Sequence, residues 1–203
     1  MSTITTSNSL SVDDLGSAAQ RDRRKRILDA TITLAAQGGF DAVQMRAVAE
    51  QADVALGTLY RYFPSKIHLL VSALGREFER AESRIDGRAI EGDTASERVI
   101  HVLRLTTRGL QGDPHLTEAL TRAFMFADAS VATEIHTVGM QLTSMLTKAM
   151  HPGRDTLTDD DVAIARVIGD VWLSALVAWV TGRATAAETA AHMERAVHLL
   201  LRD

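Results

Sequence analysis

The segment from Gln44 to Lys66 constrains the fold of this chain more than any other. It reads QMRAVAEQADVALGTLYRYFPSK, and its apolar positions predict two short helices joined by a tight junction. Pro64 ends the second helix, because the residue before a proline disfavours the helical conformation. Two short helices with a tight junction are the layout of a helix-turn-helix, whose second helix lies in the DNA major groove.

The second of these helices, over residues 55–63, separates into two faces when it is placed on a wheel of about 100° per residue. Leu56, Leu59 and Phe63 fall in one narrow sector, which predicts that they face the core. Gly57 lies at the edge, where a missing side chain lets a backbone approach a partner closely. The opposite, outward face carries Ala55, Thr58, Arg61 and Tyr62. Such side chains are better suited to contact with a DNA groove than to exposure to solvent. The alternative is an ordinary helical hairpin that carries these side chains on its surface without binding DNA.

The distribution of charge agrees with DNA binding. The chain has a net charge of −4, but residues 1–86 carry equal numbers of acidic and basic side chains, so the acidic excess lies in residues 87–203. Five basic residues and a single acid occupy the run from Arg21 to Arg26. Phosphate binding needs local positive charge and tolerates an acidic remainder. A solvated helix face is the alternative, and the position just ahead of the helix-turn-helix favours the phosphate.

Lys66 gives a further indication of DNA. Ser65 is expected to cap a long helix that ends near Asp86, which places Lys66 in its first turn. A lysine there opposes the helix dipole, so it does not serve helix stability. A phosphate at this helix start would satisfy both the lysine and the free backbone N–H groups.

The rest of the chain predicts further helices and no strands. Capping-box spacings at Thr94/Glu97 and Thr185/Glu188 mark two helix starts. Thr158 and the triplet 159–161 mark another, and the three carboxylates are expected to serve the helix dipole and not to bind a metal. The predicted helices span about residues 17–37, 45–52, 55–63, 65–86, 94–111, 114–126, 131–150, 162–181 and 185–201.

These elements give an all-α protein with four parts. Residues 1–16 are expected to be a disordered tail without the features of a signal peptide. Residues 17–66 form the DNA-binding domain, with the helix-turn-helix motif at about 45–63, and residues 67–86 form a connecting helix. Residues 87–203 form a larger helical domain. The chain has no cysteine, which suits the cytoplasm, and no motif calls for a cofactor or a metal.

The segment from Val162 to Thr181 is the most apolar helix predicted. Arg166 and Asp170 stand four residues apart and could pair across one turn. These two charges and the following Gly182-Arg183 make it a poor membrane span. A helix that is apolar on nearly all sides must be buried, either inside the domain or against a second copy.

The motif GTLYRYFPSK, preceded by MRAVAEQA and by RDRRKRILDA, resembles the TetR family of bacterial transcriptional repressors. The resemblance covers about residues 21–78. It implies a three-helix DNA-binding head, a larger helical ligand-binding and dimerisation domain, and a homodimer formed through the last two helices, about 162–201. Such a dimer places two recognition helices in successive major grooves of a near-palindromic operator. The DNA contacts implied by motif position are Gln44, Thr58, Tyr60, Tyr62 and Lys66, with Arg46 and Arg61 as further contacts.

Longer runs, including AQRDRRKRILDAT, LLVSALGREF, LTEALTRAF and ARVIGDVWLSALVAW, resemble actinobacterial members of this family that repress cholesterol-catabolism genes. That resemblance implies release from DNA by a steroid acyl-CoA thioester, with a fatty or other hydrophobic acyl-CoA as the alternative effector. A steroid needs a long apolar cavity with few polar groups. The candidate lining residues are Leu103, Thr106, Phe124, Met125, Met140, Ser144, Met145, Trp172 and Ala175. Methionine and aromatic residues at helical spacing also suit an ordinary core.

Two other classes of function are possible from the sequence. An enzyme acting on acyl-CoA would use a histidine with a nearby acid, and no catalytic order or phosphate loop supports it. The candidate groups are His101, His115 and His136 with Glu118 or Glu134. A scaffold that only dimerises is the second alternative, but it has no use for the outward face beside Gly57.

Overall fold

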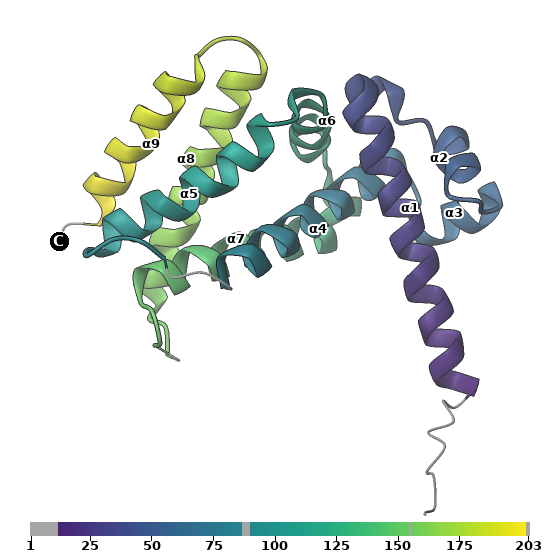
Figure 1. Ribbon diagram of the computed structural model, residues 1–203, viewed down its shortest axis with the longest axis horizontal. Helices are drawn as coiled ribbons and strands as arrows, with labels where there is room; N and C mark the ends of the chain where they lie inside the picture. The colour runs from purple at the N-terminus through teal and green to yellow at the C-terminus, as the bar shows by residue number, and fades with distance from the viewer. Residues whose placement is uncertain (1–11, 87–89, 155, 202–203) are drawn as a thin grey trace, which may run out of the picture.

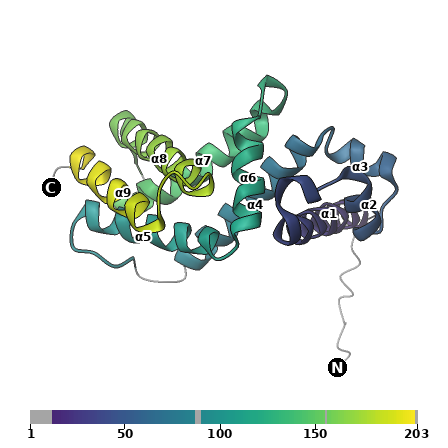
Figure 2. The same cartoon turned by 90° about the horizontal axis from the view of Figure 1, so that it is seen from above.

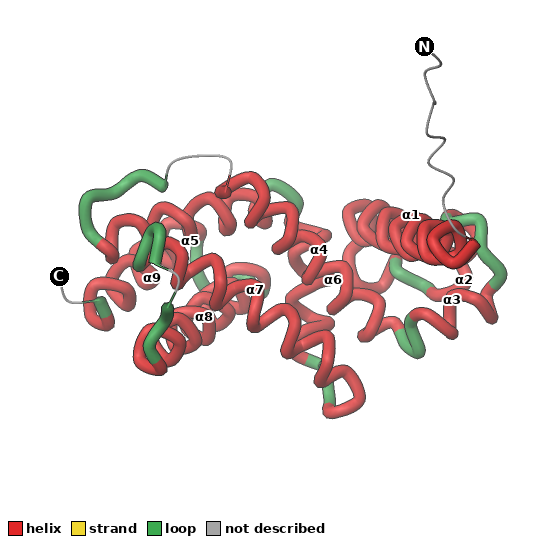
Figure 3. The backbone as a smooth tube through the Cα atoms, turned by 90° about the horizontal axis from the view of Figure 1, so that it is seen from below, coloured by secondary structure: helices red, strands yellow, loops and turns green. Residues whose placement is uncertain are grey.

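The computed structural model describes residues 12–86, 90–154 and 156–201, and these residues form helices and no β-strand (Figure 3). The prediction of an all-α fold is confirmed. Figure 1 shows a small helical head and a larger helical body, with the body helix α6 (Pro114–Met125) next to the head. The long helix α4 (Lys66–Asp86) runs from the head into the body.

The head consists of α1 (Val12–Ala42), α2 (Met45–Gln51) and α3 (Leu56–Tyr62). Helix α1 begins at Val12, five residues before the predicted start, and the rest of the expected tail, residues 1–11, lies outside the described residues. At Gly38 and Gly39 the backbone leaves helical geometry, as the sequence predicts, and Gly39 has a φ of 66°. The chain is helical again up to Ala42.

The head is held by a small apolar core. Leu59 and Phe63 are buried, as the wheel predicts, and Leu56 packs against the same core. Helices α1, α2 and α4 and the linker between α1 and α2 supply the other large buried side chains, among them Ile27, Leu28, Val43, Val48, Leu69 and Leu70. This core fixes how α3 is presented.

Helix α4 (Lys66–Asp86) connects the head to the body. Its first turn is capped by Ser65, whose Oγ accepts the backbone N–H of His68 at 3.4 Å. Helix α4 contacts α1 in the head and contacts α6 and α7 in the body. A displacement of α4 therefore involves both parts.

The body contains α5 (Ala95–Gln111), α6 (Pro114–Met125), the short 3-10 helix η1 (Ala129–Val131), α7 (Ala132–Met150), α8 (Asp159–Val180) and α9 (Ala186–Leu200). Figure 2 shows α5, α8 and α9 grouped away from the head, whereas α6 lies next to it. The predicted capping boxes at Thr94/Glu97 and Thr185/Glu188 are both formed, and Thr158 with Asp161 makes a third.

The acidic triplet at 159–161 opens α8. Asp161 accepts the backbone N–H of Thr158 at 2.8 Å and also bonds Nε2 of His151 at 2.7 Å. The Thr158 hydrogen bonds, together with His151, lower the pKa of Asp161 to about 2. Within the described ranges, no group of three or more His, Cys, Asp and Glu side chains could hold a metal ion.

Helix α8 packs between α7 and α9 but leaves one side uncovered. By length and composition it is the one helix of the described residues that could cross a membrane, with a mean hydropathy of 1.6 over its most apolar window and 28% of that window buried. Arg166 and Asp170 are both exposed, and within the described part of the chain no ion pair joins them. The pairing proposed from their spacing is absent from this structure.

Candidate DNA-binding surface and ligand cavity

The exposed face of α3 is built around Tyr60 and Arg61. Tyr60 is 47% exposed, and Arg61 lies in the last turn of the helix. A Cβ added at Gly57 would meet nothing within 4 Å, so the backbone is open to a partner there. Thr58 is half-buried at the side of this face. Together they present hydroxyl, aromatic and guanidinium groups around an accessible stretch of helix.

Tyr62 lies differently from what the wheel predicts. Its side chain is half-buried against the head core, with its ring centroid 6.4 Å from that of Phe63. Gln44 and Arg46, at the start of α2, are both exposed beside α3. Of the seven side chains expected at DNA, four are thus exposed, while Thr58, Tyr62 and Lys66 are half-buried.

Lys66 has an environment that sequence reasoning missed. Its Nζ lies 3.9 Å from the ring centroid of Phe40, and the guanidinium carbon of Arg122 lies 4.5 Å from the same centroid. Burial lowers the pKa of Lys66; Asp41 and Glu118 oppose this shift, whereas Arg122 adds to it. The two cations over one ring connect the start of α4 and helix α6 to the end of α1.

The same junction contains a hydrogen bond between head and body. The carboxylate Oε2 of Glu118 accepts the backbone N–H of Phe40 at 2.8 Å. A Cβ placed on Gly39 would lie 2.6 Å from that oxygen, so a side chain there would displace the Glu118 carboxylate and would also be strained by the φ of 66°. Glu118 also lies 3.5 Å from Arg122, one turn further along α6. We call Gly39, Phe40, Lys66, Glu118 and Arg122 the head–body joint.

The body encloses a cavity of about 500 Å³. Its walls are mostly apolar and come from α4, α5, α6, α7 and α8. Its exposed lining residues include His136 and Met140 on α7 and Arg166 and Asp170 on α8, so the cavity opens between these two helices. An apolar interior with charged groups at one opening suits an elongated ligand that has one apolar and one polar end.

Helix α4 contributes to the wall of this cavity, which the sequence did not suggest. Leu74 and Phe78 line it, and the ring of Phe78 lies 5.8 Å from that of Trp172, centroid to centroid. Helix α6 lines it through Leu120 and Thr121, while Glu118 on the same helix reaches the head. Both helices that touch the head therefore also touch the cavity.

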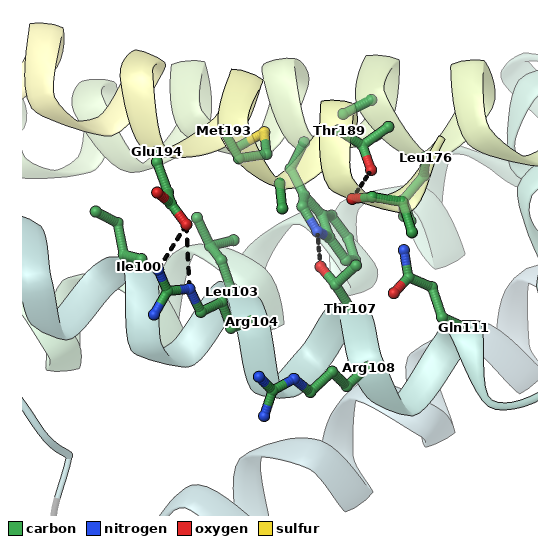
Figure 4. A pocket seen from close by; sticks show the side chains of 14 residues that line it. Ile100, Leu103, Arg104, Thr107, Arg108, Gln111, Leu176, Thr189, Met193 and Glu194 are labelled. Atoms are coloured by element: carbon green, nitrogen blue, oxygen red, sulfur yellow. Dashed lines mark hydrogen bonds and ion pairs between the residues drawn. The ribbon is translucent and has the colours of Figure 1, made fainter. Parts of the chain in front are cut away.

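A second, smaller cavity of about 150 Å³ lies between α5, α8 and α9 (Figure 4). At one side Arg104 forms an ion pair with Glu194 at 2.6 Å. The indole N–H of Trp172 donates to Oγ1 of Thr107 at 2.8 Å. Trp172 and Leu176 line both cavities and form the partition between them.

Known protein families match both parts of the chain. Residues 27–73 match the model described as bacterial regulatory proteins of the tetR family. Residues 92–200 match the tetracyclin repressor-like C-terminal domain. The chain belongs to the TetR family.

Individual relatives agree with this assignment over nearly the whole length. The chain is 57% identical to the transcriptional repressor KstR of Mycolicibacterium smegmatis, over 95% of this chain and 93% of the relative. It is 58% identical to KstR of Rhodococcus jostii, over 96% and 90%. Among solved structures it resembles a TetR transcriptional regulator from Rhodococcus sp. RHA1, with a TM-score of 0.85, 31% identity and coverage of 91% and 98%. This TetR-family protein is thus a KstR-like transcriptional repressor.

The structure distributes the nine expected ligand-contact residues over three environments. Phe124, Met140 and Trp172 line the larger cavity, and Trp172 also lines the smaller one with Leu103 and Ala175. Four residues line neither cavity: Thr106 and Met145 are buried, Met125 is exposed, and Ser144 donates to Glu82 on α4. The lining residues that sequence reasoning missed include Leu74, Phe78, Leu120, Thr121, Leu142 and Thr143.

The groups considered for an enzyme have other partners or positions. Glu118 belongs to the head–body joint, and Nδ1 of His101 lies 3.6 Å from Glu91. His136 stands at the opening of the larger cavity. The relatives reported above are named as repressors and not as enzymes.

Proposed function

We propose that this KstR-like repressor binds a near-palindromic operator as a homodimer and is released from it by a steroid acyl-CoA thioester. One observation carries the proposal: the larger cavity is lined by α4 and α6, the two helices that also contact the head. A ligand in the cavity therefore touches the elements that set the position of α3.

The size and polarity of the cavity support an effector with a bulky apolar body. Its volume of about 500 Å³ lies within the range of small-molecule sites, roughly 300–1,000 Å³. A steroid body fits such a space, whereas the coenzyme A part must remain at the opening between α7 and α8. Arg166 and His136 stand there, and we expect Arg166 to face the anionic end of the effector.

A fatty acyl-CoA is the alternative effector. Two regulators with the same fold have been solved with such ligands: FadR of Bacillus subtilis with stearoyl-CoA and FadR of Thermus thermophilus with lauroyl-CoA. These proteins are 22% and 20% identical to this chain, so their likeness concerns the fold alone. The volume of about 500 Å³ and the aromatic rings of Trp172 and Phe78 in the lining suit a bulky apolar body, so we expect the steroid thioester to be preferred.

Release from DNA requires a difference in affinity between two conformations. The effector must bind the form whose heads do not match the operator more tightly than the form that does, since equal affinity for both shifts nothing. In a dimer, the two copies of α3 must reach major grooves about 34–36 Å apart. A displacement of α4 and α6 around the effector changes that separation.

The uncovered side of α8 and α9 supports dimer formation by these helices. It exposes small or apolar side chains, among them Val167 at 45% and Leu199 at 64%. Ala163, Ser174, Ala187 and Ala191 are exposed on the same two helices. A second copy packed there would complete a bundle, as the family resemblance implies. We expect this assembly in the cytoplasm, where the operator is.

The dimer can be tested by sedimentation. The 22.0 kDa chain should sediment as a dimer, and Val167→Glu should sediment as a monomer at the same concentration, because a buried unpaired carboxylate is costly. Gln51→Glu, at an exposed position on α2, is the control and should remain dimeric. A Val167→Glu protein that remains dimeric would place the interface elsewhere.

The proposal as a whole is tested by a mobility-shift assay on the promoter region of the gene itself, at stated salt concentration. A steroid acyl-CoA should abolish the shifted band, while the free steroid acid, free coenzyme A and stearoyl-CoA at the same concentration should not. Loss of the band with stearoyl-CoA alone would support the fatty acyl-CoA alternative. A band that persists with every thioester would refute acyl-CoA as the effector class.

A further inference from the structure

One arginine of the basic run on α1 is directed at the helix-turn-helix itself. Nη1 of Arg26 donates to the backbone carbonyl of Ala52 at 2.6 Å and lies 3.3 Å from that of Asp53. Ala52 is the C-cap of α2, and Asp53 begins the turn that leads to α3. The charged group that the sequence suggested for phosphate therefore lies on the junction between the two helices.

This junction needs such a donor. The last carbonyl groups of a helix have no partner within the helix, and a charged donor stabilises them more than a neutral one does. Asp53 has a φ of 51°, a left-handed conformation that costs free energy for a residue other than glycine. Arg26 donates to the carbonyl groups of Ala52 and Asp53, which lie before and after the Cα of Asp53, so it stabilises the turn in the conformation that directs α3.

The guanidinium is itself held in place. Nε of Arg26 lies 3.2 Å from the carboxylate of Asp22, one turn earlier on α1. The side chain is half-buried, which limits its freedom to turn towards solvent. The planar guanidinium of Arg26 donates to two carbonyl groups and one carboxylate at once. A lysine ammonium lacks the planar arrangement of donors that this requires.

A second arginine lies at the other end of α3. The guanidinium carbon of Arg24 is 5.4 Å from the ring centroid of Phe63, which is the C-cap of α3 and is buried. Figure 1 shows α1 running beside α2, and these two helices are in contact. Helix α1 thus contacts the chain just before α3 and just after it.

We propose that Arg26 is a positioning residue for DNA recognition: it fixes the orientation of α3 through the Ala52–Asp53 turn and does not bind phosphate. The proposal rests on sequence-specific DNA binding by this repressor. It separates Arg26 from the remaining basic residues of the run, which keep their expected role at phosphates.

The charge-conserving variant Arg26→Lys distinguishes the two roles. Specific operator affinity and affinity for an unrelated duplex are measured at several salt concentrations, below the melting temperature established by circular dichroism. Arg26→Lys should lower operator affinity about tenfold, since charge-assisted hydrogen bonds are lost. It should change non-specific affinity less than about twofold and leave the slope of log K against log[salt] unaltered.

Arg84→Lys is the matched control, because Arg84 has the same charge, is exposed in the last turn of α4, and has no hydrogen bond or ion pair to the head among the described residues. It should leave both affinities near the wild-type values. Arg26→Gln adds a second measurement: because no phosphate contact is lost, its slope should differ from that of the wild type by less than about one unit.

Two results would overturn the proposal. An operator affinity that Arg26→Lys leaves unchanged, with a slope reduced by about one in Arg26→Gln, would make Arg26 a phosphate contact. An equal loss of specific and non-specific affinity that follows a lowered melting temperature would make it a general stabilising residue. A wild-type protein that fails to distinguish operator from unrelated DNA would refute the proposed function instead.

Discussion

The head and the body of this repressor differ in how the space between their helices is filled. In the head, α1, α2 and α3 close on a core of fully buried side chains, and Arg26 ties the turn before α3 to α1. In the body, five helices surround a cavity of about 500 Å³, with a second cavity behind Trp172. The packed core of the head fixes the exposed face of α3, whereas the body leaves space between its helices that a ligand can occupy.

This difference shows why the two parts need a specific joint. A closely packed head cannot absorb a change in shape, so it moves as a unit when its neighbours move. Helices α4 and α6 of the body contact α1, so under the proposed function they carry a change of shape around the ligand to the head. The hydrogen bond from Phe40 to Glu118 and the two cations at the Phe40 ring are among the contacts at which the parts meet.

Filling the cavity should remove the response of the body and spare the head. Gly139 lines the larger cavity, and a Cβ there would meet nothing within 4 Å. Gly139→Leu should lower steroid acyl-CoA affinity by roughly tenfold to a hundredfold, because the added side chain takes space that the ligand needs. Operator binding without effector should be unchanged in a mobility-shift assay.

Gly109→Leu is the control for that variant, because Gly109 on α5 is equally open and lines neither cavity. Both variants gain helix propensity, so neither should lower the melting temperature. Unaltered effector affinity in Gly139→Leu would mean that the ligand binds elsewhere.

A substitution at the head–body joint should affect stability. Gly39→Ala places a Cβ 2.6 Å from Glu118 at a φ of 66°. We expect the free energy of unfolding to fall by about 2 kcal/mol, because the left-handed backbone is strained and the Glu118 carboxylate must move. Urea denaturation measures it, and Gly109→Ala on an open helical position is the comparison. If Gly39→Ala is as stable as the wild type, the backbone at position 39 and the Glu118 carboxylate adjust to the added Cβ without cost.

The two tyrosines of α3 should separate recognition from packing. Tyr60→Ala should weaken operator binding about fivefold with little change in melting temperature, since the ring is 47% exposed. Tyr62→Ala should lower both operator affinity and melting temperature, because that ring packs on the head core. Steroid acyl-CoA binding should persist in both. Identical behaviour of the two variants would contradict the two environments.

The smallest expected effect concerns the start of α8 and depends on pH. The pKa of Asp161 is about 2 in the folded chain and 3.8 ordinarily, so its ionised form stabilises the fold above about pH 4. This stabilisation is lost as the pH falls through about 2. Asp161→Asn should therefore melt a few degrees below the wild type at pH 6, and the difference should close between pH 4 and pH 2. A constant difference across that range would assign the effect to packing.

Local signals in the sequence predicted the helices well. Thr94, Thr158 and Thr185 each start a helix with a capping box, because that arrangement involves only residues three apart. Gly38–Gly39 interrupts α1 and Pro64 follows α3 as predicted. The wheel placed Leu59 and Phe63 in the core correctly.

Contacts between distant residues were beyond such reasoning. Phe40 and Glu118 are 78 positions apart, so nothing in either segment suggests their hydrogen bond. Tyr62 turns towards the core because α3 ends directly after it, with Phe63 already extended. Methionine is a side chain that suits an adaptable pocket, but Met145 lies on the side of α7 that faces the core. The cavity depends on how five helices meet, and their periodicities alone do not determine that.

The single helix α1 also acts as a lever arm. Between Arg26 and the interruption at Gly38 it is an unbroken rod of about 17 Å, at 1.5 Å per residue. A tilt of about 3° at the Gly39 end displaces the other end by roughly 1 Å, which is comparable to the whole tolerance of a hydrogen bond. A tilt of α1 that is too small to disturb the packing of the head is therefore expected to shift α3. In the proposed symmetric dimer the two shifts combine, so we expect a slight motion beside the cavity to spoil the match with two major grooves.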